Sequence, residues 1–230
     1  MAGKVELPTI FLYFMSEREF PLGELDDFLA KSKALILERA QSDGVDTVEE
    51  RLNQVLKGKV TPHSFCLAHK VLDEPDLMEI CELIYCHPFL EHVYYERSPF
   101  TRATDPWDNL VKAEINSNLP VDDQLRQLRD ILGQQGDLHK KRDSALARLI
   151  QEISEKHAGN ITVVRGRGHV RSLQKACKDK NLSCQAYEAP LQGHQSLQEK
   201  LIVKMAANEQ PTPDELNAAL MERFRQGGAK

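Results

Sequence analysis

The stretch from Asn160 to Val170 brings together residue types that could do chemistry, and it reads Asn-Ile-Thr-Val-Val-Arg-Gly-Arg-Gly-His-Val. Its residues 161–164 are all β-branched, which predicts a strand buried on both faces. Gly166 and Gly168 predict a turn, and His169 stands at the entrance of the next helix. Open α/β folds bind ligands where a strand turns into a helix. There His169 could transfer a proton, ligate a metal or simply pack on its neighbours.

Arg142 stands where a helical pattern calls for an apolar side chain. The stripe continues in steps of 4, 3 and 4 through Leu146, Leu149 and Ile153. Helix residues rise about 1.5 Å each, so the part of this helix that follows Arg142 is about 21 Å long. The strand that comes next is about 16 Å long. If the two run antiparallel, Arg142 lies level with the turn at residues 166–169. At that position Arg142 would either take part in the function of the site or form an ion pair with Asp143 or Glu96 that serves the structure alone.

Five strand-like segments are separated by segments with helical periodicity. They cover residues 9–15, 34–37, 91–96, 161–164 and 183–188. This alternation predicts an α/β fold with a mainly parallel central sheet of about five strands and helices on both faces. Right-handed crossovers would bring the carboxyl ends of the strands to one edge of the sheet.

Charged residues follow the strands at that predicted edge. We expect Glu38, Arg142 and His169 to share one site as the residues that would carry catalysis, with side-chain ends no more than about 12 Å apart, the reach of a small-molecule pocket. The expected ligand-binding neighbours are Glu17, Glu96, Arg97, Gly166, Arg167 and Gly168. A site built outside the packed core predicts that His169→Ala costs no more than about 1 kcal/mol of stability.

The chain is expected to form one domain over residues 1–230. Residues 121–157 read as two helices, interrupted at Gly133–Gly136, with Asp137 as the N-cap of the second. Helices within 197–226 would pack on the domain or extend from it as an appendage, the last one opened by a capping box at Thr212–Glu215.

Composition limits the partners. The net charge of −5 gives no basic field for nucleic acid, although Arg165, Arg167 and Arg171 form a local basic patch. No apolar run approaches the roughly 18 residues that span a bilayer, and no signal peptide is recognisable. Five cysteines without regular spacing are typical of free thiols, so a cytoplasmic location is expected, with no nucleic-acid or membrane partner.

Two further motifs have simpler explanations than ligand binding. Gly166-Arg167-Gly168 with Glu188 half-matches a dinucleotide fingerprint, but Arg171 replaces the third glycine, so nucleotide binding stays a minor alternative. His63, Cys66 and His69 suggest zinc, but on a helix the two histidines point about 120° apart and lie about 9 Å apart along the axis. Helical histidines and a buried thiol explain them better, and no metal site is assigned.

The order of these elements resembles the TraB/ChaN/Tiki and erythromycin-esterase-like superfamily. The resemblance rests on Arg142-Asp143 early in a helix, on the following strand, and on Gly166-Arg167-Gly168-His169 as a Gly-x-x-His motif. Glu38 in Leu-Ile-Leu-Glu matches the family's early acid. The family's first Gly-x-x-His motif is missing, because the first strand is followed by Ser16-Glu17-Arg18.

The resemblance implies a divergent hydrolase or an inactive relative, because Tiki-like members hydrolyse peptides with a metal, ChaN-like members bind haem and esterase-like members open a lactone. The leading expectation is a pocket at the sheet edge for a small anionic ligand or a peptide carboxylate. The alternatives are a metal-dependent hydrolase and an interaction module whose helices at 197–225 dock a partner. A divalent metal such as manganese or magnesium is conceivable but not favoured, since the nearby arginines would oppose a cation.

Overall fold

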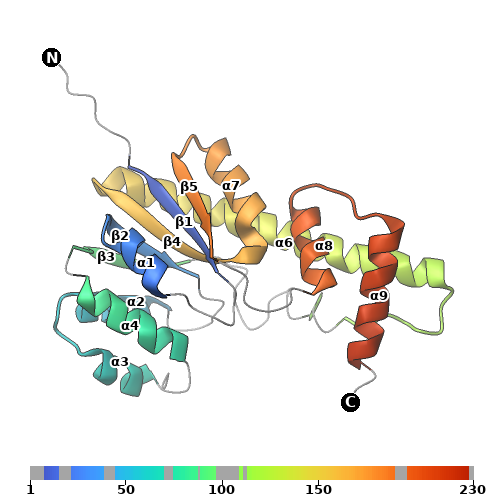
Figure 1. Cartoon of the computed structure of the whole chain (residues 1–230), viewed down its shortest axis with the longest axis horizontal. Helices are drawn as coiled ribbons and strands as arrows, with labels where there is room; N and C mark the ends of the chain where they lie inside the picture. The colour runs from blue at the N-terminus through green and yellow to red at the C-terminus, as the bar shows by residue number, and fades with distance from the viewer. Residues whose placement is uncertain are drawn as a thin grey trace.

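The computed structural model of the chain describes residues 8–15, 22–38, 45–69, 75–87, 89–96, 109–110, 113–189 and 196–227. A five-stranded parallel sheet in the order β3-β2-β4-β1-β5 forms its centre (Figure 1). The strands are β1 (Ile10–Met15), β2 (Ser32–Leu37), β3 (His92–Tyr95), β4 (Asn160–Gly166) and β5 (Cys184–Glu188). The predicted α/β class and all five predicted strands are confirmed.

The strand register brings every carboxyl end to one edge of the sheet. Met15, the last residue of β1, pairs with Gly166 of β4. Leu37, the last residue of β2, pairs with Val164, which lies two residues before Gly166 on the same strand. The residues after β2, β3 and β4 therefore meet, as expected for parallel strands.

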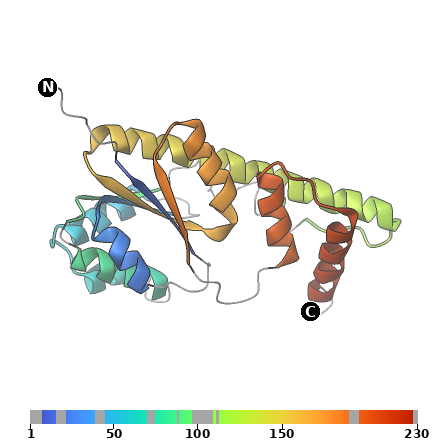
Figure 2. The ribbon, with the colours of Figure 1, turned by 45° about the horizontal axis from the view of Figure 1, so that its top comes forward.

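Helices cover both faces of the sheet (Figures 1 and 2). On one face α1 (Leu22–Leu29), α2 (Val45–Leu56), α3 (Pro62–His69) and α4 (Pro75–Cys86) form one apolar cluster with the sheet. On the other face α6 (Val121–Lys156) and α7 (Val170–Asp179) form a second. Successive strand residues point to opposite faces, so the continuous apolar run of β1 serves both clusters, Leu12 on one and Tyr13 on the other.

Helix α6 is a single helix of 36 residues, so the predicted interruption at Gly133–Gly136 is wrong. Gly136 instead lets another helix come close. A Cβ added there would lie 3.0 Å from the backbone nitrogen of Ala206. Because that close packing stabilises the assembled helix, it offsets the poor helix propensity of glycine.

The N-terminal half of α6 extends beyond the sheet, and α8 (Leu197–Ala206) and α9 (Pro213–Gly227) pack on it (Figure 2). A third apolar cluster joins these helices, with Leu128, Leu201 and Leu216 at its centre. Reciprocal bonds between Thr212 and Glu215 confirm the predicted capping box. Among the described residues, no helix is both long and apolar enough to cross a bilayer.

Candidate functional site

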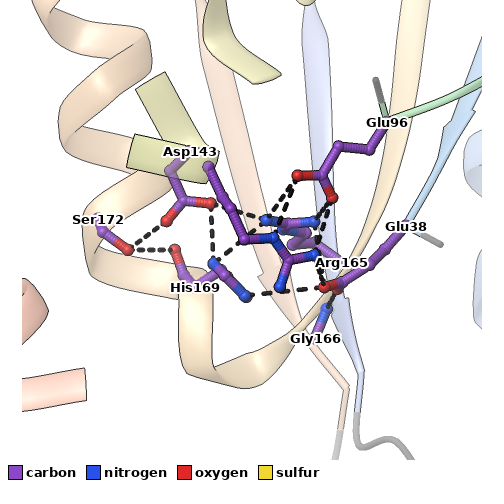
Figure 3. A network of polar contacts seen from close by, with 8 residues as sticks. Glu38, Glu96, Asp143, Arg165, Gly166, His169 and Ser172 are labelled. Atoms are coloured by element: carbon purple, nitrogen blue, oxygen red, sulfur yellow. Dashed lines mark hydrogen bonds and ion pairs between the residues drawn. The ribbon is translucent and has the colours of Figure 1, made fainter. Parts of the chain in front are cut away.

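Charged side chains from several elements meet at the carboxyl edge of the sheet (Figure 3). Arg142 and Asp143 come from the middle of α6, and Glu38 and Glu96 directly follow β2 and β3. The other members lie on β4, on the short helix η1 (Arg167–His169) and on α7; they are Arg165, Gly166, His169 and Ser172. We call these eight residues the charge network.

Arg165 lies at the centre of the charge network, and its side chain is 1% exposed. Its guanidinium donates to Glu96 and lies 3.1 Å from Oε1 of Glu38 and 3.2 Å from Oδ1 of Asp143. Burial alone would lower the pKa of Arg165, but the three carboxylates outweigh it and raise that pKa. Arg165 therefore carries a permanent positive charge that holds the three acids together.

Arg142 reaches the same acids from α6. Its Nη2 donates to Oε1 of Glu38 and to Oε2 of Glu96, both at 3.0 Å. The helix arithmetic that placed Arg142 at this edge is therefore confirmed. The side chain keeps 12% of its surface exposed, so its charge is accessible from one side.

Glu38 is the most exposed carboxylate of the network, at 23% of its side chain. Burial would raise its pKa, but Arg165, His169 and Arg142, with the backbone N–H of Gly166, hold it well below the usual range. That N–H donates to Oε2 of Glu38 over 2.6 Å. Glu38 is therefore ionised at neutral pH and can only accept hydrogen bonds.

Asp143 orients the imidazole of His169. Its Oδ1 lies 2.8 Å from Nδ1 of His169, while Ser172 donates its hydroxyl proton to Oδ2. Burial would raise the pKa of Asp143, but His169, Arg165 and Ser172 lower it, so the acid is ionised. An ionised acid accepts only, so Nδ1 of His169 carries the proton toward Asp143. Nε2 then faces Glu38, with 3.7 Å between Nε2 and Oε1.

His139 lies one turn before Asp143 on α6 and stacks on His169. The ring centroids are 4.0 Å apart and the planes differ by 9°. Burial, and then the charge of His169, lower the pKa of His139 to about 3, so His139 is neutral at physiological pH. Gly168 leaves room for the stack, since a Cβ there would lie 3.3 Å from Cε1 of His139.

The structure brings together all three residues expected to carry catalysis. Oε1 of Glu38 lies 3.0 Å from Arg142 Nη2 and 3.7 Å from His169 Nε2, so the predicted proximity is confirmed, while the roles of the three residues stay predictions. Of the expected neighbours, Glu96 and Gly166 belong to the charge network. Arg167 instead donates to the carbonyl of Ala189, and Gly168 lies against His139. Glu17 and Arg97 lie outside the described residues.

Four residues of the site were not among the predicted site residues, and they are Arg165, Asp143, Ser172 and His139. Asp143 entered the sequence analysis only as a possible partner of Arg142 and as part of the family motif, and Arg165 only as part of the basic patch. One signal was available: His139, Arg142 and Asp143 have the i, i+3, i+4 spacing that places side chains on one helix face. For Arg165 and Ser172, the pattern of apolar and polar residues along β4 and α7 does not indicate which way the polar side chain points.

Two expectations need correction. Arg165, Arg167 and Arg171 do not form one basic patch, because Arg165 is buried among acids and Arg171 pairs with Glu209 at 2.6 Å. His169 is not outside the packed core either, since it is only 4% exposed and bonded to Asp143. With that burial, the expected cost of His169→Ala becomes about 1–3 kcal/mol.

No protein-family model, no curated protein and no solved structure matches this chain.

The arrangement suits proton transfer better than metal binding. Glu38 Oε1 and His169 Nε2 are the pair that could ligate a cation, but two guanidinium nitrogens lie 3.0 and 3.1 Å from that same oxygen. Their charge opposes a cation there. No group of three or more His, Cys, Asp or Glu side chains suited to a metal occurs in the described part of the chain. A catalytic zinc normally takes three protein ligands.

Proposed function

We propose that the chain is a TraB/ChaN/Tiki-like protein whose site at the carboxyl edge of the sheet is a divergent hydrolase centre with His169 as its acid–base residue. One observation carries the proposal. Asp143 holds Nδ1 of His169 at 2.8 Å, which directs Nε2 toward Glu38, the most exposed acid of the network. A carboxylate that fixes the tautomer and orientation of an imidazole is a recurring arrangement in acyl-transfer enzymes.

The proposed reaction follows from those positions. In its unprotonated form His169 takes a proton from water at Nε2, and the resulting hydroxide attacks the acyl carbon of an ester or amide. Arg142, which is part exposed, stabilises the negative charge that develops on the acyl oxygen. When the carbon–oxygen or carbon–nitrogen bond breaks, the leaving group takes the proton back from His169. Glu38 stabilises the protonated imidazole in between.

A purely structural role for the network is a weaker explanation. Buried ion pairs lose much of their mutual attraction to desolvation, and apolar side chains of similar size stabilise a fold as well or better. Charged groups gathered at a sheet edge where α/β proteins bind ligands are therefore more typical of function.

The test is hydrolysis of a panel of ester, lactone and peptide substrates by the purified chain. For any substrate that is cleaved, we expect His169→Gln to lower kcat at least about 100-fold, the usual contribution of a general base. His63→Gln is the matched control, because His63 is exposed on α3 far along the chain from the network. Equal activity in the wild type and His169→Gln would refute the proposal.

The main alternative is a metal-dependent hydrolase, and metal analysis separates the two. The proposed centre predicts that the chain purified without added metal has no stoichiometric transition metal and hydrolyses equally well after chelation. A bound zinc or manganese that disappears in His169→Ala would replace the proposed mechanism by a metal-activated water.

A non-catalytic binding module on the same fold is the other alternative. It is favoured by the fact that all three carboxylates of the network already have guanidinium partners. In that case a small anionic ligand or a peptide carboxylate would bind beside the network without being changed. Binding without turnover across the substrate panel would support it.

A further inference from the structure

A cleft of about 380 Å³ lies between η1, α7 and α8, beside the turn that carries His169 of the charge network. Val170, Leu201 and Val203 give it apolar walls. Charged residues from η1, α7, α8, β5, α9 and the segment before α9 complete the lining. Its volume is in the range of small-molecule sites, which often lie where two packed units meet.

The charges of the cleft do not cancel. Arg171 is paired with Glu209 at 2.6 Å, and Lys204 is paired with Glu215 at 2.8 Å. Two further cations, Arg167 and Lys200, also line the cleft, and neither takes part in an ion pair with any described residue. Among the described residues of the lining Glu188 is the one remaining acid, so these residues together carry an excess of one positive charge.

Arg167 has donors left for a ligand. Its Nη2 donates to the backbone carbonyl of Ala189, which fixes the guanidinium at the end of β5. Its Nε is buried and has no hydrogen-bond partner among the described residues. Buried donors without acceptors are rare in folded proteins. The planar fork of arginine matches the two oxygens of a carboxylate or phosphate group.

We propose that this cleft binds a small ligand by its carboxylate or phosphate group, with Arg167 and Lys200 as the anchors and the apolar wall in contact with the rest of the ligand. Arg167 and His169 are two residues apart on the same short helix, so a ligand held in the cleft lies beside the turn that carries His169. The cleft would thus anchor the substrate of the proposed hydrolase. Only this last link rests on the proposed function, because anion binding is measured without any reaction.

Calorimetric titration of the full chain with inorganic phosphate, acetate and hexanoate tests the proposal. We expect saturable binding of at least one of them, weakened about 10-fold or more by Arg167→Gln and several-fold by Lys200→Gln. Stronger binding of hexanoate than acetate would assign the cleft to carboxylates with an apolar tail. Tighter binding of phosphate than of either would assign it to phosphorylated ligands.

The matched control is Arg148→Gln, which removes an exposed arginine from the far part of α6 and should leave binding unchanged. Lys200 is exposed on α8, so its variant keeps the test valid if Arg167→Gln does not fold. Absence of binding at millimolar concentration, or equal weakening by Arg148→Gln, would overturn the proposed cleft site. Neither result bears on hydrolysis by His169, which the substrate panel measures separately.

Discussion

Arg165 holds three carboxylates together from the end of a central strand, and this gives it a large expected effect on stability. Arg165→Met would remove a guanidinium partner from both Glu96 and Asp143, which are 1% and 0% exposed. Removing one partner of a buried ion pair usually costs about 3–5 kcal/mol. We expect a loss of that size in the free energy of unfolding measured by urea titration.

The control for this substitution is Arg148→Met on the exposed face of α6, which should change stability by no more than about 0.5 kcal/mol. If both variants unfold at the same urea concentration, the network contributes nothing to the fold.

His139 predicts a dependence of stability on pH. Its folded pKa of about 3 lies below the usual 6.5, so the unfolded chain binds more protons between these values. Stability must therefore fall as the pH drops from about 6.5 toward 3, by up to about 1.4 kcal/mol per pH unit from this residue. In His139→Phe that contribution is absent, so unfolding between pH 6.5 and 4.5 should depend less on pH.

The range from pH 6.5 to 4.5 distinguishes the effect of His139 on stability from that of the carboxylates. The carboxylates Glu38 and Asp143 have lowered pKa values, so their contribution is present above the unfolded value of about 4 and is lost below it. His63→Phe, at an exposed position on α3, should keep the wild-type slope. A slope in His139→Phe equal to that of the wild type would contradict the assignment.

For single residues, the sequence predicted a meeting correctly where the geometry of the backbone alone determines the position of the side chain. Glu38 and His169 follow from the strand ends, and Arg142 from the rise of a helix. Arg165 could not be predicted in the same way, because β4 is buried on both faces and its apolar neighbours do not mark an inward side. The spacing of His139, Arg142 and Asp143 places His139 on the same face of α6 as the two other residues, but Ser172 can be assigned to the site only when α7 is placed against α6.

Helix α6 offers a comparison between two glycines on one helix. At Gly136 an added Cβ would meet backbone of α8 at 3.0 Å, whereas at Gly133 it would meet only the mobile end of Met205 at 3.4 Å. Gly136→Ala should therefore destabilise the chain by about 1–3 kcal/mol through overpacking. Gly133→Ala should stabilise it by up to about 1 kcal/mol through better helix propensity.

Thermal unfolding of the two variants checks this pair. Two changes of equal size and the same sign would mean that propensity alone decides, and that α8 does not need the close approach at Gly136.

The same glycines explain why the sequence predicted two helices instead of one. Gly133, Gly136 and Asp137 together imitate the end of one helix and the N-cap of the next. In the structure Asp137 is exposed and pairs with Lys140 at 3.0 Å within the helix. Packing on α8 outweighs these local signals, and a single sequence does not record which element will pack there.

The described residues form two apolar clusters on the sheet and a third around α8 and α9, which predicts that the third can open separately. Leu216 is fully buried in that cluster. Leu216→Ala should speed hydrogen exchange in α8, in α9 and in the N-terminal half of α6, while β1 and β4 keep their protection. Exchange followed by mass spectrometry gives the readout.

Leu173→Ala, at an equally buried position in the cluster between α7 and the sheet, is the matched comparison. It should speed exchange in the sheet instead. If Leu216→Ala accelerates exchange in β1 as much as in α9, the chain opens as one unit.

The position of β1 in the sheet also bears on how the chain reaches its fold during synthesis. β1 precedes the other described strands in the sequence, yet both of its neighbours, β4 and β5, come from residues 160–188. Until those residues leave the ribosome, the apolar segment Ile-Phe-Leu-Tyr-Phe-Met has no strand to pair with. Such an unpaired strand is prone to association with other chains, and pairing over so long a separation is slow. The nascent chain therefore exposes an unpaired apolar strand until residues 160–188 have been translated.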